Sequence, residues 1–285
     1  MSVIVTGATG HLGRFVIDGL LEKVMADQIT AVVRSEEKAA DFAARGLKTW
    51  IADYNIPETF DGLFSADDKV LLISSNELTK DRGGQHKGVL DAAKAAGVAF
   101  FAYTSGLGTV TAAIADGDRR TEAAIIESGL PYTLLRNGWY NENYTEQLAP
   151  VLQYNTVTQA AGDGHVASAA RADYAAAAVA VLTGEGHENK TYELSGNTAW
   201  SFAEYAAELS RQTGKEIVYN AVSVEAYTDI LTGQAGLPEP LAAIFADVEA
   251  SIEQGELAST GGVLSRLIGR PTTPIADSIA AALKV

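Results

Sequence analysis

The sequence contains no cysteine among its 285 residues. This absence excludes disulfide bonds, thiolate catalysis and zinc sites built from cysteine. Basic residues are also few: 21 lysines and arginines stand against 36 acidic residues, which gives a formal net charge of −15. A field of that sign repels nucleic acid and anionic membrane surfaces, so we expect neither as a partner. Any anionic ligand must therefore be captured by local geometry.

Long apolar runs are absent as well. No stretch of the sequence approaches the roughly 20 apolar residues of a membrane-spanning helix. The opening residues, MSVIVTGATG, read as a first strand and not as a basic leader. We therefore expect a cytoplasmic protein, and its 47% of hydrophobic residues is enough to form a sizeable core.

Short apolar runs alternate with longer amphipathic ones in the first half of the chain. The pattern predicts helices between six strands, which cover about residues 2–7, 28–35, 47–54, 69–75, 98–105 and 130–137. This alternation predicts a Rossmann-type, doubly wound parallel sheet in an α/β fold, with a smaller α+β C-terminal lobe. We expect residues 1–136 to form a dinucleotide-binding domain. Residues 137–285 should form mostly a substrate-binding lobe, with a segment at about 165–195 returning to the first domain.

Three glycines follow the first predicted strand in the stretch VTGATGHLGRF. Gly7 allows a tight turn, Gly10 lets the backbone approach a pyrophosphate, and Gly13 lets the first helix pack closely on the sheet. The N–H groups and partial positive charge at the helix start favour a bound phosphate. We expect cofactor contacts from residues of this turn: Gly7, Thr9, Gly10, His11, Leu12 and Gly13.

Arg34 ends the second predicted strand, near where NAD-binding sequences commonly place an acid. A guanidinium can form paired hydrogen bonds with a 2′-phosphate, and Lys38 lies one helical turn later. We therefore predict NADPH as the cofactor, with NADH bound more weakly; the alternative is that Arg34 is a solvated strand end. Further cofactor contacts are expected from strand ends: Asp53, Ser74, Ser75, Tyr103, Thr104 and Ser105. For the two serines, capping of the next helix is the alternative.

The sequence also lacks the usual reductase dyad. No tyrosine is followed four residues later by lysine, and no lysine occurs between Lys94 and Lys190. Reduction of a ketone requires a positioned acid for the alkoxide, whereas reduction of a quinone gives a phenolate that water can protonate. The sequence therefore favours a flat, electron-poor acceptor. The four histidines have no metal-binding spacing, so we expect no metal and place His86 and the others at surfaces or turns.

Amide and aromatic residues crowd together after the sixth predicted strand, in LLRNGWYNENY. This stretch should lie at the carboxyl edge of the sheet, where ligands of open α/β sheets bind. We expect Asn137 and Tyr140 to be catalytic, and substrate contacts from Asn137, Gly138, Trp139 and Tyr140. Packing of the two lobes together is the alternative role for Trp139 and Tyr144. Arg171 and Asp173, at the start of an alanine-rich helix, are predicted to be structural.

Several stretches of the sequence together resemble the NmrA-like atypical short-chain dehydrogenase/reductase family. These stretches are VTGATGHLG, LLISS, YTS, LPYTLLRNGWYNENY, AAGDGHVASAARADYAAAA and GHENKTYELSG. Within it they are most similar to the NAD(P)H:quinone oxidoreductases of type 2, and somewhat less to the triphenylmethane reductases. The resemblance implies a Rossmann domain with a smaller lobe. It also implies NADPH on the glycine turn, with an arginine at the 2′-phosphate, which here is Arg34.

The resemblance implies NADPH-dependent reduction of quinones, or similar flat acceptors, by direct hydride transfer. It leaves open a redox-sensing regulator that binds NADP(H) without turnover, and a triphenylmethane dye or enone reductase. A small quinone-like molecule is the expected partner of a monomer or homodimer. One position departs from the relatives, which carry a histidine where this sequence has Asp118. We hypothesise that this acid favours cationic acceptors.

Overall fold

The computed structural model describes residues 2–108 and 110–284 of the chain. These residues form two compact units. The first unit comprises Met1–Gly106, Asp116–Asn137 and Tyr174–Tyr192. The second comprises Leu107–Ala115, Gly138–Asp173 and Glu193–Val285. Residues 174–192 of the segment near 165–195 thus belong to the first unit, and residues 165–173 and 193–195 to the second.

The first unit is built on a seven-stranded sheet with the order β3-β2-β1-β4-β5-β6-β9. Pairing is parallel from β3 through β6. The predicted doubly wound α/β fold is confirmed, with strands β1 (Val3–Val5), β2 (Ile29–Val33), β3 (Lys48–Ile51), β4 (Lys69–Ile73), β5 (Phe100–Gly106), β6 (Tyr132–Asn137) and β9 (Lys190–Leu194).

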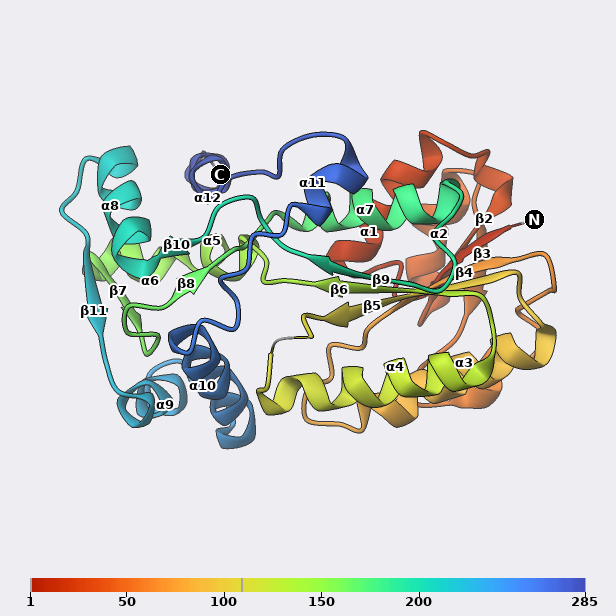
Figure 1. The fold of residues 1–285 in the computed structure, drawn as a ribbon, viewed down its shortest axis with the longest axis horizontal. Helices are drawn as coiled ribbons and strands as arrows, with labels where there is room; N and C mark the ends of the chain where they lie inside the picture. Colours follow the sequence, from red (N-terminus) through yellow and green to blue (C-terminus); the bar gives the residue numbers. More distant parts are fainter. Residues whose placement is uncertain (1, 109, 285) are drawn as a thin grey trace. The chain divides into compact units, whose positions relative to one another are not determined.

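Helices cover both faces of this sheet. In Figure 1, α3 and α4 lie on one face, and α1 and α7 lie on the other. The helices of this unit are α1 (His11–Leu21), α2 (Glu36–Ala44), α3 (Arg82–Ala96), α4 (Asp116–Ser128) and α7 (Arg171–Thr183), whose first three residues belong to the second unit. Coverage on both faces explains why β1 and β2 are buried at every residue and read as continuous apolar runs. Between β3 and β4 the chain forms a single 3₁₀ turn, Pro57–Phe60.

The turn formed by residues 7–13, here called the glycine turn, joins β1 to α1. Gly7 has φ +62°, a left-handed conformation that glycine adopts without strain. A Cβ on Gly13 would lie 2.3 Å from the Gly7 carbonyl oxygen and 2.8 Å from the Ala8 Cα. Gly13 therefore brings α1 against the turn itself, and not only against the sheet as its spacing predicts.

The second unit contains small sheets and several helices. β8 (His165–Val166) pairs antiparallel with β10 (Trp200–Ser201), and β7 (Thr156–Gln159) pairs in parallel with β11 (Val218–Ala221). Its helices are α5 (Glu142–Thr145), α6 (Leu148–Tyr154), α8 (Phe202–Thr213), α9 (Val224–Gly233), α10 (Glu239–Glu253), α11 (Val263–Ile268) and α12 (Ile275–Ala282). Aromatic rings from α5, β10 and α8 fill the core of this unit. None of the helices described in the chain has both the length and the apolarity of a membrane span.

The close contact at Gly13 predicts a large effect of one methyl group. Gly13→Ala should lower the free energy of unfolding by about 1–3 kcal/mol, because the added Cβ overlaps backbone atoms that cannot rotate away. Gly233→Ala is the matched control: this glycine ends helix α9 and has no atom within 4 Å of an added Cβ. Its substitution should be neutral or stabilising by up to about 1 kcal/mol. Urea unfolding of both variants tests the contact, and equal effects would contradict it.

Candidate active site

The glycine turn presents the start of α1 without a capping side chain. Gly10 is the N-cap residue, and its backbone N–H donates to the Gly7 carbonyl at 3.0 Å. Among the described residues, no side chain caps the first turn of α1, so its N–H groups can receive an anion. His11 is exposed and Leu12 is buried. Thr9 contributes its carbonyl to the turn, where it accepts a 3.2 Å hydrogen bond from Arg14 Nε.

Two cations follow strand β2. Arg34 and Lys38 are both exposed, and among the residues that the structure describes neither forms an ion pair. Arg34 lies close enough to Tyr54 to act on its hydroxyl: burial raises the pKa of Tyr54 well above its usual value, and a hydrogen bond from Thr6 and the charge of Arg34 oppose that shift. The Tyr54 hydroxyl also lies next to the glycine turn, because an added Cβ on Gly7 would be 3.6 Å from it. The charge of Arg34 therefore acts on a group that contacts the glycine turn.

The polar groups at the ends of β3 and β4 are largely engaged within the protein. Asp53 Oδ1 accepts hydrogen bonds from the Asn55 backbone N–H (2.8 Å) and side-chain amide (2.9 Å). The Ser74 N–H donates to Thr104 Oγ1 at 3.0 Å, and the Ser75 N–H donates to His86 Nε2 at 2.9 Å. These residues shape the carboxyl edge of the sheet, and the Ser75 hydroxyl accepts from the Glu77 N–H in the loop before α3. Neither serine caps the next helix, because the N-cap residue of α3 is Asp81.

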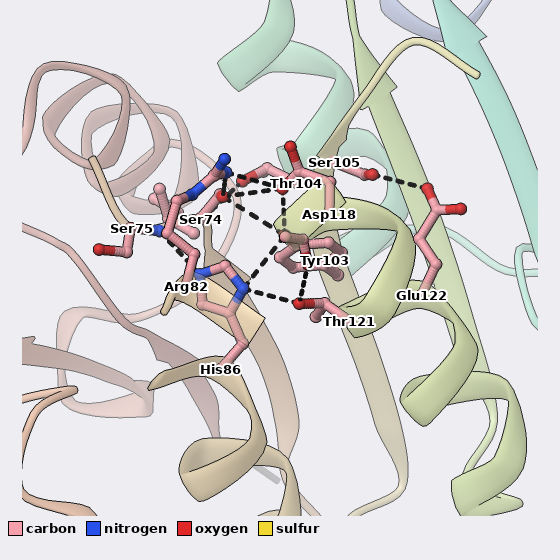
Figure 2. A network of polar contacts seen from close by, with 12 residues as sticks. Ser74, Ser75, Arg82, His86, Tyr103, Thr104, Ser105, Asp118, Thr121 and Glu122 are labelled. Carbon is pink, nitrogen blue, oxygen red and sulfur yellow. Dashed lines mark hydrogen bonds and ion pairs between the residues drawn. The ribbon is translucent and has the colours of Figure 1, made fainter. Parts of the chain in front are cut away.

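Figure 2 shows a buried polar network behind this edge, which links β4, β5, α3 and α4. At its centre Asp118 Oδ1 accepts from Arg82 Nη2 (2.8 Å), the Tyr103 hydroxyl (2.5 Å) and the Ser74 hydroxyl (3.1 Å). The side chains of Arg82 and Asp118 are 8% and 10% exposed. Tyr103 is fully buried, and burial, with Asp118 as the second cause, raises the pKa of its phenol.

The burial of Asp118 contradicts the hypothesis that it presents a negative charge to cationic acceptors. Its carboxylate is paired with a guanidinium inside the first unit. The sequence places an acid in this position, but it gives no sign that Arg82, 36 residues earlier, supplies the opposite charge. Arg82 is the residue of this network that sequence reasoning missed.

His86 is likewise not a surface histidine. It is fully buried, and its Nε2 accepts the Ser75 N–H. The remaining proton therefore resides on Nδ1, which donates to Thr121 Oγ1 at 2.8 Å, since the Thr121 hydroxyl itself donates to the Gly117 carbonyl. Burial, reinforced by the charge of Arg82, lowers the pKa of His86 to about 3, so the imidazole is neutral at physiological pH.

Ser105 is held by a second ion pair in the first unit. Its hydroxyl donates to Glu122 Oε1 at 2.6 Å, and Glu122 also receives both Nε (2.9 Å) and Nη2 (2.6 Å) of Arg136. Arg136 lies in strand β6 and forms this bidentate pair. The pair fixes β5 against β6 directly before Asn137, which is buried as the last residue of β6.

The segment directly after Asn137, Gly138–Asp173, belongs to the second unit. The Gly138 N–H donates to the Leu194 carbonyl at 2.7 Å, and Trp139 accepts from the Ala169 N–H at 3.2 Å. Trp139 packs partly buried against the aromatic core of the unit, and Tyr144 is inside that core, with its ring centroid 5.0 Å from that of Trp200. Tyr144 therefore packs within the core of the second unit.

Asn141 anchors this segment, although the sequence shows it only as one amide among several. It is fully buried. Its Nδ2 donates to the Thr273 carbonyl (3.1 Å) and to Ser278 Oγ (2.9 Å), while its Oδ1 accepts from Ser168 Oγ (2.6 Å). Nearby, Asp173 pairs with Arg270 at 2.6 Å and accepts from the Thr273 N–H at 2.7 Å, which is the structural role predicted for it.

The buried Arg82–Asp118 pair predicts strong coupling between the two residues. Asp118→Asn or Arg82→Met should each cost about 3–5 kcal/mol of unfolding free energy, because each leaves one buried charge without its counterion. The double variant should cost clearly less than the sum. Lys87–Asp91 is the control, since both side chains are exposed, and Asp91→Asn should cost less than about 1 kcal/mol. Additive losses in the Arg82–Asp118 double-mutant cycle would refute the coupling.

His86 predicts a pH dependence of stability. Its pKa is about 3 in the folded protein and 6.5 ordinarily, so the unfolded chain binds the extra proton first as the pH falls. As the pH falls from roughly 6.5 to 3, His86 should therefore lower the free energy of unfolding by up to about 1.4 kcal/mol per pH unit. Above roughly pH 6.5 it should have no effect on the free energy of unfolding. Urea unfolding across this range should show a shallower fall in His86→Gln than in the exposed control His165→Gln. Parallel curves would refute the assignment.

Comparison with known proteins gives consistent matches over the whole chain. The model of a family described as NAD(P)H-binding matches residues 7–185. Quinone oxidoreductase 2 of Escherichia coli K12 is 45% identical over 279 residues, which cover 97% of each chain. The crystal structure of an NADPH-dependent quinone oxidoreductase of E. coli with NADPH matches with a TM-score of 0.94 and 44% identity, over 99% of each chain.

Citrobacter triphenylmethane reductase also matches, with a TM-score of 0.93 and 40% identity over 100% of each chain. An NmrA-like oxidoreductase of Aspergillus flavus is 25% identical over 98% of this chain and 94% of its own. The resemblance seen in the sequence motifs is therefore confirmed. The chain belongs to the NAD(P)H-binding family that includes these reductases.

Proposed function

We propose that this protein is an NADPH-dependent oxidoreductase that reduces quinones, or similar flat and electron-poor acceptors, by direct hydride transfer. The observation that carries the proposal is the similarity over 97% of both chains to a quinone oxidoreductase. A solved relative of this kind was crystallised with NADPH.

The first unit has the features that a dinucleotide requires. The glycine turn brings backbone and the uncapped start of α1 together, which suits a pyrophosphate. Arg34 and Lys38 are exposed beyond β2, so either can receive a 2′-phosphate. When bound, the nicotinamide supplies a hydride, and the protein supplies position and electrostatics.

We assign the acceptor to the segment that begins at Asn137. Asn137 offers an amide at the end of β6, and Trp139 and Tyr140 offer aromatic faces on which a quinone can stack. Asn141, buried and hydrogen-bonded on both amide atoms, holds this segment in place within the second unit. The proposed division is thus a dinucleotide-binding first unit and a second unit that contributes acceptor binding.

Reduction of triphenylmethane dyes is the second candidate activity, because the chain is 40% identical to a triphenylmethane reductase along its whole length. A regulator without turnover is the alternative from another class. In each case we propose a small molecule as ligand, in a cytoplasmic monomer or homodimer.

The first experiment follows the loss of reduced-nicotinamide absorbance when the protein is mixed with NADPH, or with NADH, and benzoquinone. Saturable oxidation that favours NADPH is expected. Tight NADPH binding without oxidation of any quinone or dye would instead support the regulator.

Arg34→Asp then tests the reading of the 2′-phosphate. It should lower kcat/KM for NADPH by roughly 10- to 100-fold, the value of one or two charge-assisted hydrogen bonds, and leave kcat/KM for NADH unchanged or improved. Lys48→Asp is the control, because it makes the same charge change at the exposed start of β3. The start of β3 lies at the amino ends of the parallel strands, opposite to the carboxyl ends where Arg34 follows β2. An unchanged cofactor preference in Arg34→Asp would remove Arg34 from the site.

A further inference from the structure

The guanidinium of Arg171 lies over the aromatic ring of Tyr140. Its Cζ is 5.5 Å from the ring centroid, which is within the range of a cation–π interaction. Tyr140 lies between β6 and α5, and Arg171 is the first residue of α7. Both belong to the second unit, so their relative position is set within one compact body.

Arg171 is fixed in this position from two sides. Its Nη1 and Nη2 both donate to the carboxylate of Glu146, the second at 3.3 Å. Its backbone N–H is 3.0 Å from each carboxylate oxygen of Glu142. The Arg171 side chain is only 12% exposed, so the guanidinium has little freedom to leave the ring.

The backbone of Tyr140 is tied to the segment that leads to Arg171. Tyr140 and Ala169 form an isolated parallel bridge, and the Asn141 N–H donates to the Ala169 carbonyl at 3.0 Å. Ala169 is two residues before Arg171. The ring and the cation are therefore brought together by backbone contacts as well as by side-chain packing.

We propose that Tyr140 donates the proton that completes reduction of the acceptor, and that Arg171 is the positioning residue that holds Tyr140 and stabilises its phenolate. A positive charge over the ring favours the negative charge that spreads through a phenolate. Arg171 thus takes the electrostatic role that short-chain reductases give to the lysine that this chain lacks. This inference rests on the proposed function.

The proton balance is simple. Transfer of a hydride to a quinone moves two electrons and one hydrogen, and leaves one acceptor oxygen as an anion. The O–H bond of Tyr140 breaks, its proton bonds to that oxygen, and a phenolate remains beneath Arg171. A proton from solvent restores the phenol, so the acceptor gains two electrons and two protons in total.

The charges around Tyr140 determine the sign of the effect. Arg171 is the cation at the ring, and Glu146, whose side chain is 49% exposed, shares it. Glu142 receives the Arg171 N–H, and burial raises the pKa of its carboxyl. Asp173, on the same turn of α7, is engaged by Arg270 and Thr273. Removing Arg171 should therefore disfavour the phenolate, and neutralising Glu146 should favour it.

The test is the pH dependence of kcat with saturating NADPH and benzoquinone. In the wild type, kcat should fall at alkaline pH as Tyr140 loses the proton that it donates. Tyr140→Phe should lower kcat by about 10-fold or more and abolish this fall. Arg171→Met should move the fall to higher pH with a lower plateau, and Arg171→Lys should restore both in part. Glu146→Gln should move it to lower pH.

Opposite shifts in Arg171→Met and Glu146→Gln distinguish an electrostatic role from a structural one, because loss of packing would lower kcat without moving the pH profile in two directions. Full kcat in Tyr140→Phe, or an alkaline fall at the same pH in all variants, would overturn the inference while the wild-type turnover still supports the proposed function. An inactive wild type would overturn the proposed function itself.

Discussion

The contact between α1 and the glycine turn is the constraint on which the first unit depends. With hydrogen in place of a Cβ at Gly13, the helix approaches the Gly7 carbonyl and Ala8 so closely that no side chain fits between them. This approach directs the start of α1 at the carboxyl edge of the sheet. Tyr54 and Ile73 lie next to Gly7 of the turn, and the Tyr54 hydroxyl forms hydrogen bonds with Thr6 and with the Ile73 carbonyl.

This arrangement explains how a chain of net charge −15 can hold an anion. The long-range field is unfavourable, but the amides of the helix start and the two cations after β2 act at contact distance, where geometry outweighs net charge. Two buried acids close to the edge of the sheet are neutralised by arginines. Asp118 is paired with Arg82 and Glu122 with Arg136, so neither adds an uncompensated negative charge.

In the second unit, too, contacts within the protein fix the position of a group that we propose for ligand binding, here a pair of aromatic side chains. Trp139 and Tyr140 follow β6 in a segment whose backbone is tied to Ala169 and whose anchor, Asn141, is completely buried. The cation over Tyr140 comes from a residue 31 positions later; Glu146, the C-cap residue of α5, pairs with its guanidinium, and Glu142 in α5 accepts its backbone N–H. Rigid aromatic positions of this kind suit a flat acceptor, because little side-chain freedom is lost when it binds.

The sequence by itself determined the strands, the glycine turn, the position of Arg34 and the family, because these depend on local periodicity, on residue types at fixed spacing and on ordered motifs. It did not reveal the short elements β7, β8, β10, α5 and α6, whose few residues carry too little periodicity. Only the tertiary structure decided which polar residues are buried and with whom they pair. From the sequence, Asp118 is interpreted as an acid that faces acceptors, His86 as a surface histidine and Arg171 as the start of a helix. In the structure Asp118 pairs with Arg82, His86 accepts from Ser75, and Arg171 lies over Tyr140. Burial and charge pairing depend on contacts between segments that are distant in the sequence, so a local sequence pattern does not predict them.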